Sequence, residues 1–241
     1  MEETAAAARR ILGHIHGGRV LDVATGRGGF VAFLADGLAD YDEIVGIELD
    51  ADRQTAFEAA TAGRRDVRFV LGDFLGTAFE PDSFDTVAVS ASLHHFDDPT
   101  AVLRRMRDLV RPGGWVVISE MYRDGQTEAQ RTEVAVHDWM AEVDTATGGV
   151  HRPTFRRSEI IRLVDDLGLE DVWTTDRADL LIDPHDPAAV AEIGDMIDRY
   201  AAKAAGAAGL AEHAGALRER LARLGVQEAT ILTFVGLRPS G

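Results

Sequence analysis

A glycine-rich turn between an apolar run and a helical pattern constrains the fold of this chain more than any other feature. Residues 20–24 are apolar except for Asp22, which is typical of a buried strand in a parallel sheet. Residues 25–29 contain three glycines, and residues 30–34 then carry apolar side chains at helical spacing. A strand, a glycine turn and a helix in this order are typical of nucleotide binding. Glycine lets the backbone approach a ligand, and a helix N-terminus offers free N–H groups.

The spacing of the glycines separates the kinds of nucleotide. A dinucleotide fingerprint starting at Gly26 and Gly28 requires a small residue at position 31, and this position is Val31. The chain also has no Tyr-x-x-x-Lys pair. An NAD(P)-dependent oxidoreductase is therefore a disfavoured alternative.

Composition narrows the classes of function. The chain has 241 residues, 41 acidic against 25 basic side chains, and a formal net charge of −16. A surface of this charge repels phosphate backbones and anionic membranes, so we expect neither nucleic acid nor a membrane as a partner. The absence of cysteine excludes disulfides, thiolate metal sites and a cysteine nucleophile. The sequence lacks a membrane-length apolar run and a signal-like start, so we expect a cytoplasmic protein.

Strand-like and helix-like segments alternate along the chain. The expected strands are residues 20–24, 43–48, 67–71, 84–90, 115–119, 169–175 and 229–237. The expected helices are residues 5–15, 29–36, 51–62, 99–110, 126–144 and 158–167, with further helix inside 187–224. This alternation predicts an α/β fold with a doubly wound, seven-stranded, mostly parallel sheet, in a single domain over residues 1–241.

Motifs follow the ends of several expected strands. Glu48 ends the second strand about twenty residues after the glycine turn, where a carboxylate in such a sheet reaches ribose hydroxyls. Residues 71–74 read Leu-Gly-Asp-Phe, residues 90–99 read Ser-Ala-Ser-Leu-His-His-Phe-Asp-Asp-Pro, and residues 109–115 read Leu-Val-Arg-Pro-Gly-Gly-Trp. With the Asp-Val-Ala-Thr-Gly-Arg-Gly segment at 22–28, residues 18–120 resemble class I S-adenosylmethionine (SAM)-dependent methyltransferases. The similarity is to the subgroup that includes ubiquinone and menaquinone biosynthesis enzymes and many small-molecule methyltransferases.

The resemblance implies SAM as the cofactor and a set of residues that bind it. Leu49 would lie against the adenine, Asp73 would accept from its exocyclic amine, and the Phe74 N–H would face the ring. Glu48 could instead be a solvated strand end, and Asp73 a turn residue. The cofactor-binding residues expected are Asp22, Thr25, Gly26, Gly28, Glu48, Leu49, Gly72, Asp73, Phe74 and Ser90.

Methyl transfer to a hydroxyl or an ammonium requires a base, and histidines near the strand ends are candidates. His94 and His95 fall where the methyl end of the cofactor is expected, although packing and backbone hydrogen bonds are an alternative use. His137 shares a helical face with Glu133 and Asp144, which suits a base with an orienting carboxylate, a metal site or a solvated acidic face. The catalytic candidates are His94, His95, Tyr122, His137 and His151. We expect no metal.

These observations predict a SAM-dependent methyltransferase that acts on a small-molecule acceptor as a monomer or homodimer. Residues of about 121–155 and 178–225 are expected to be helical insertions. In the methyltransferase fold that the resemblance implies, insertions at these places lie over the acceptor pocket, so they would form a lid. A protein that binds SAM or S-adenosylhomocysteine (SAH) without catalysis is an alternative.

Overall fold

A seven-stranded sheet organises the chain in a computed structural model that describes residues 10–64, 66–207 and 209–241. Its strands are β1 (Arg19–Val23), β2 (Glu43–Glu48), β3 (Val67–Leu71), β4 (Phe84–Ser90), β5 (Val110–Met121), β6 (Glu170–Arg177) and β7 (Ile231–Leu237). The order across the sheet is β3-β2-β1-β4-β5-β7-β6. β7 runs antiparallel to β5 and β6, and the other pairs are parallel. The predicted seven-stranded, mostly parallel sheet is confirmed.

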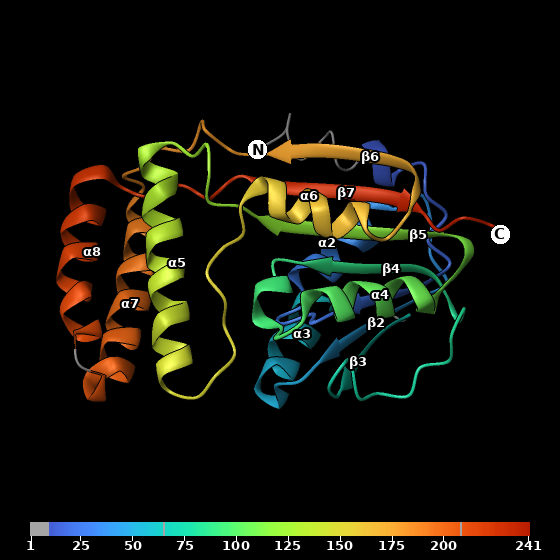
Figure 1. Cartoon of the computed structure of the whole chain (residues 1–241), viewed down its shortest axis with the longest axis horizontal. Coiled ribbons are helices and arrows are strands. Elements are labelled where there is room, and N and C mark those ends of the chain that lie inside the picture. The colour runs from blue at the N-terminus through green and yellow to red at the C-terminus, as the bar shows by residue number, and fades with distance from the viewer. Residues whose placement is uncertain (1–9, 65, 208) are drawn as a thin grey trace.

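Helices cover both faces of this sheet (Figure 1). The α-helices are α2 (Gly29–Gly37), α3 (Gln54–Ala60), α4 (Pro99–Leu109), α5 (Glu128–Ala146), α6 (Arg157–Asp165), α7 (Pro187–Lys203) and α8 (Leu210–Leu224). Short 3-10 helices are η1 (Ala51–Arg53), η2 (Leu93–His95) and η3 (Ala204–Gly206). Met106 of α4 and Val164 of α6 belong to one apolar core, whereas Leu34 of α2 and Phe57 of α3 belong to a second. Two cores on opposite faces are the arrangement of a doubly wound sheet.

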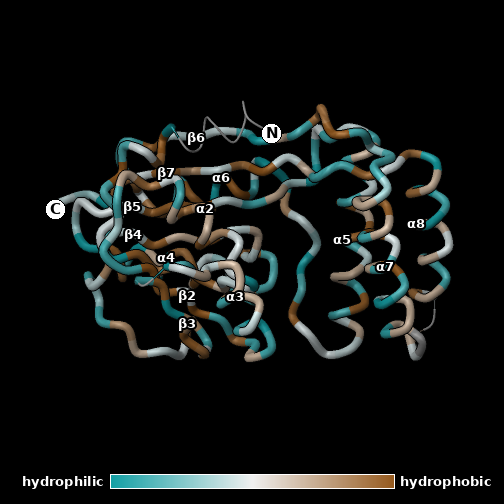
Figure 2. The backbone as a smooth tube through the Cα atoms, turned by 180° about the vertical axis from the view of Figure 1, so that it is seen from behind, coloured by the Kyte–Doolittle hydropathy of each residue, from teal (hydrophilic) through white to brown (hydrophobic). Residues whose placement is uncertain are grey.

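Three helices form a bundle at one end of the sheet. The bundle consists of α5, α7 and α8, which lie side by side at the end of the sheet to which the arrowheads of β4 and β5 point (Figure 1). Val136 and Val143 of α5 pack there with Ile197 of α7 and Leu217 of α8. In Figure 2 hydrophobic colouring follows the central strands, whereas hydrophobic and hydrophilic residues alternate along α8. Both segments expected to be insertions therefore contain helices, and no helix of the described residues is long and apolar enough to cross a membrane.

Several predicted boundaries are wrong in detail. β5 begins at Val110 and not at residue 115, because residues 111–114 remain beside β4 as an irregularity between the Phe84–Val110 and Thr86–Trp115 pairs. A Cβ at Gly114 would lie 2.6 Å from the carbonyl oxygen of Asp85, so only glycine fits this approach. Of the helix predicted over residues 5–15, residues 10–12 are helical, and residues 1–9 lie outside the described residues.

Candidate functional site

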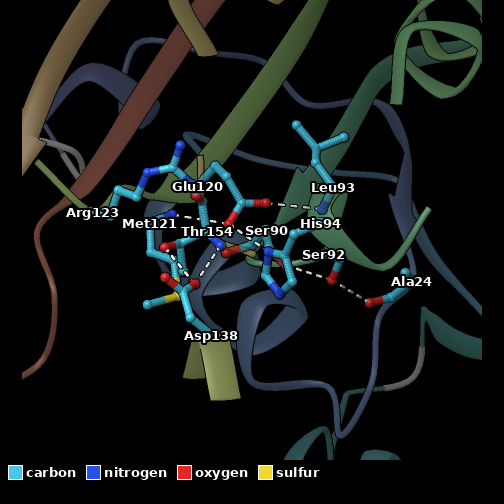
Figure 3. Close-up of polar contacts among 10 residues, drawn as sticks. All are labelled: Ala24, Ser90, Ser92, Leu93, His94, Glu120, Met121, Arg123, Asp138 and Thr154. Atoms are coloured by element: carbon cyan, nitrogen blue, oxygen red, sulfur yellow. Dashed lines mark hydrogen bonds and ion pairs between the residues drawn. The ribbon is translucent and has the colours of Figure 1, made fainter. Parts of the chain in front are cut away.

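The ends of β1 and β4 face each other where the strand order changes direction. β2 and β3 lie on one side of β1, whereas β4 and β5 lie on the other, and a crevice opens at such a point beyond the carboxyl ends of the strands. Ala24 and Ala91 directly follow the two strands with φ of +52° and +46°, a strained conformation for any residue with a Cβ. The Ser92 hydroxyl donates to the carbonyl oxygens of Ala24 (3.3 Å) and Ser90 (2.7 Å), which joins the two loops (Figure 3).

The glycine turn has one glycine that faces open space and one that is packed. Gly26 has φ of +55°, and a Cβ placed on it would meet no atom of the described residues within 4 Å. Gly28 has φ of +80°, and a Cβ on it would lie 2.9 Å from Cδ2 of Phe57. Gly28 is therefore required by helix packing, whereas Gly26 leaves room for a ligand.

The Glu48 carboxylate connects the end of β2 to this turn. Its Oε2 accepts from the Gly26 N–H (2.8 Å), and its Oε1 accepts from the N–H groups of Leu49 (2.9 Å) and Asp50 (3.0 Å). Leu49 is 73% exposed, and Leu71 at the end of β3 is 55% exposed. A carboxylate flanked by two exposed leucines matches the polar sugar and the flat base of a nucleoside.

The end of β3 lies beside the end of β2. The Gly72 N–H donates to the Glu48 carbonyl oxygen (2.8 Å). Asp73 is exposed, and its Oδ1 accepts from the Leu75 N–H (3.1 Å), so the turn role that the sequence left open is present. Phe74 is buried in the core.

Asp22 and Thr25 are buried polar residues under the turn. Neither Asp22 oxygen, nor the Thr25 hydroxyl, has a hydrogen bond of normal geometry among the described residues. Burial raises the pKa of Asp22 from 3.8 to about 7; the Thr25 hydroxyl opposes this shift and the Glu48 charge adds to it. Because the pKa is raised on folding, the contribution of Asp22 to stability is greatest below about pH 4 and is lost as the pH rises to about 7. A cation bound beside Asp22 would offset this loss.

The structure brings together four histidines that the sequence offered as separate candidates. The rings of His94 and His95 in η2 lie near those of His137 on α5 and His151 in the loop after α5. The ring centroids of His94 and His137 are 4.6 Å apart, and those of His95 and His151 are 4.2 Å apart. We name this group the histidine cluster. It lies between the carboxyl end of β4 and the three-helix bundle.

A buried carboxylate, Glu120, and a half-buried one, Asp144, orient rings of the cluster. Nδ1 of His94 lies 3.0 Å from Oε1 of Glu120, whose other oxygen accepts from the Leu93 N–H (2.9 Å), as Figure 3 shows. Nδ1 of His151 lies 2.7 Å from Oδ2 of Asp144. A carboxylate beside Nδ1 favours a proton on that nitrogen and leaves the Nε2 lone pair free.

The remaining candidates do not join this cluster. The Tyr122 ring packs in the core, and burial first, then Asp176 of β6, raises the pKa of its hydroxyl. Glu133, predicted to share the face of His137, accepts instead from the Ala229 N–H before β7, and burial raises the pKa of Glu133 to about 7. Glu133 lies one helical turn before His137, and its carboxylate is paired outside the cluster. Thr154, on the loop that carries His151, donates to Asp138 of α5 (Figure 3).

The fold is that of a doubly wound α/β protein, with its strand-end loops gathered where the strand order changes direction. A methyltransferase-domain family matches residues 2–174, so the chain belongs to this family, the class I SAM-dependent methyltransferases. Demethylmenaquinone methyltransferase of Roseiflexus castenholzii is 37% identical over 113 residues, 45% of this chain and 45% of that protein. The Staphylococcus aureus enzyme of the same name is 31% identical over 104 residues, 43% of each chain. The match thus spans less than half the length of these curated relatives.

Solved structures share the fold over nearly the whole chain. One is the complex between the Haloferax volcanii Trm112 methyltransferase activator and a methyltransferase. It superposes with a TM-score of 0.62 at 23% identity, covering 99% of this chain and 90% of that chain. Phosphoethanolamine N-methyltransferase 2 of Haemonchus contortus, solved with phosphomonomethylethanolamine and SAH, gives 0.57 at 16% identity, covering 98% and 52%. At these identities the likeness concerns the fold.

Proposed function

We propose that this chain transfers the methyl group of SAM to a small-molecule acceptor. The observation that supports this most is the open space at Gly26, beside the point where the strand order changes direction. The Gly26 N–H donates to the Glu48 carboxylate there. A nucleoside fits there because its ribose hydroxyls can donate to Glu48 and its base can lie against Leu49. The proposed cofactor site is completed at the other strand ends by Ser90, Gly72, Asp73 and Phe74. Asp22 lies beneath the glycine turn and favours a cationic ligand.

SAM, when bound, would supply an activated methyl group, so the protein's task is to hold the acceptor in line and, where required, to remove its proton. We infer that the acceptor side is at the histidine cluster and not at Tyr122. Burial and the neighbouring imidazoles lower the pKa values of His95 and His137, so these rings are neutral near pH 7 and are weak bases that can accept a hydrogen bond from an acceptor group. The bundle of α5, α7 and α8 would then form the lid.

A small acceptor agrees with two observations. The net charge of −16 disfavours nucleic acid, and the curated relatives are named for demethylmenaquinone, a small molecule. We therefore expect methyl-labelled SAM, incubated with the chain and a cell extract supplemented with short-chain demethylmenaquinol, to label the small-molecule fraction.

The Gly26→Val variant is the control for this assay and should transfer no label. Label found only in RNA or protein would contradict the small-molecule proposal. Turnover of SAM absent under every condition, despite binding of SAH, would favour the non-catalytic alternative.

A further inference from the structure

Three ring nitrogens in the histidine cluster are buried and have no hydrogen-bond partner among the described residues. They are Nε2 of His94, Nδ1 of His137 and Nε2 of His151. An unpartnered buried polar atom costs about 1–3 kcal/mol, and native proteins contain few of them. One ring nitrogen of each of these three histidines and one of His95 lie within 4.8 Å of one another. Three unpartnered nitrogens in one such cluster indicate a shared partner that accepts several lone pairs.

The surroundings of the cluster have the arrangement found around metal-binding histidines. Such histidines almost always donate their other ring N–H to a carboxylate or carbonyl, which fixes the tautomer and aims the free nitrogen at the ion. His94 has this partner in Glu120, and His151 has it in Asp144. Asp144 is itself held by the Tyr200 hydroxyl (3.1 Å) and the Lys203 ammonium (2.6 Å), both on α7.

We propose that His94, His137 and His151 bind one divalent transition-metal ion, with the more exposed His95 as the fourth ligand. Imidazole nitrogen suits Zn²⁺, Cu²⁺, Fe²⁺ and Ni²⁺, and the chain has no cysteine to add sulfur. In tetrahedral zinc sites Zn–N distances of about 2.0–2.1 Å place ligand nitrogens about 3.3 Å apart. The widest pair of nitrogens here, 4.8 Å apart at most, would close by about 1.5 Å.

The number of unpartnered ring nitrogens separates a metal site from a general base. A general base would use one of these rings and leave the other buried nitrogens unexplained, which is why the geometry favours a metal over the metal-free site expected from the sequence.

The ion would connect segments that are far apart in the chain. His94 and His95 follow β4, whereas His137 and His151 belong to the insertion that carries α5. Metal binding would thus fix the helical bundle against the carboxyl ends of the strands. This inference does not rest on the proposed function, because it concerns binding of the metal alone.

The test uses the full chain without a histidine tag, stripped with a chelator and titrated with Co²⁺. We expect one Co²⁺ per chain with the intense visible absorption of a tetrahedral site, and displacement by Zn²⁺. His137→Ala and His151→Ala should each weaken Co²⁺ binding by more than about 100-fold. Asp144→Asn, which alters a positioning residue, should weaken it by about 10- to 100-fold.

His213→Gln on α8 is the matched control, since this exposed histidine lies outside the cluster, and it should bind Co²⁺ like the parent. Zinc-edge X-ray absorption of the parent chain keeps the test independent of the folding of the variants. It should show three or four nitrogen ligands at about 2.0–2.1 Å. Three results would each overturn the proposal. The parent could fail to bind one equivalent of Co²⁺, or the zinc ligand set could lack imidazole. The third is equal Co²⁺ affinity in folded His137→Ala and His213→Gln.

Discussion

Replacing Gly26 with valine is expected to abolish detectable binding of SAH. A side chain at Gly26 meets no protein atom within 4 Å, so it would project into the space that we assign to the cofactor. A bound ligand could not share that space, and crowding of this kind cannot be relieved by a small shift of the backbone beside β1. We expect the affinity, measured by calorimetric titration, to fall more than about 100-fold, or roughly 3 kcal/mol.

Gly168→Val is the matched control for backbone strain. Gly168, between α6 and β6, has φ of +58° against +55° at Gly26, and a Cβ there also meets nothing within 4 Å. Valine in this conformation costs about 1–3 kcal/mol of stability at either position. Only Gly26→Val should lose SAH binding. Equal affinities in the two folded variants would show that the space beside Gly26 is not the cofactor site.

Replacing Glu48 with alanine is expected to weaken SAH binding by about 1.5–3 kcal/mol, or roughly 10- to 150-fold. The change removes the proposed acceptor of the ribose hydroxyls. It also removes the partner of the Gly26 N–H, which positions the turn. The loss should appear in titrations with SAH at constant pH, with thermal unfolding measured in parallel.

Glu43→Ala serves as the control because Glu43 lies at the opposite end of the same strand. Its carboxylate pairs with Arg19 (3.0 Å) and Arg68 (2.5 Å), so its removal also breaks hydrogen bonds of β2. Both variants lose hydrogen bonds of β2, but SAH affinity should change only in Glu48→Ala. A Glu48→Ala chain that binds SAH like the parent would refute the assignment of the ribose contact.

Most of the sheet could be predicted from the sequence because its signals are local. Residues 43–48, 67–71 and 84–90 were predicted as strands, and β2, β3 and β4 have these bounds. Each of these strands pairs in parallel with a neighbour and lies between polar or glycine-containing turns, so its ends are marked in the sequence. The cofactor-side residues follow strand ends and could be named for the same reason.

The starts of α5 and α6 differ from the predicted ones because cap residues decide them. α5 was predicted from residue 126 but begins at Glu128, and the Thr127–Gln130 capping box that fixes this start is visible in the sequence. α6 was predicted to start at Ser158, yet its N-cap is Arg156, whose N–H donates to the Glu159 carboxylate. Arginine is not a common N-cap residue, so this start had no clear sequence signal.

The histidine cluster could not be predicted as one site. The spacing of His137 and Asp144 placed them on one helical face, but Asp144 pairs with His151 in the following loop. His94 meets them only because α5 packs on α7 and α8 beyond the end of β4. Contacts of this kind depend on how the insertion is placed against the sheet, and periodicity within one element carries no information about that placement.

Calorimetric titration of the parent chain with SAH and, separately, with NADH tests the central claim most directly. The account predicts one SAH site per chain with micromolar affinity, about −8 kcal/mol, and no heat of binding with NADH. Both ligands contain an adenosine, so the comparison isolates the part of the site that distinguishes them. Binding of NADH without detectable binding of SAH would contradict the account.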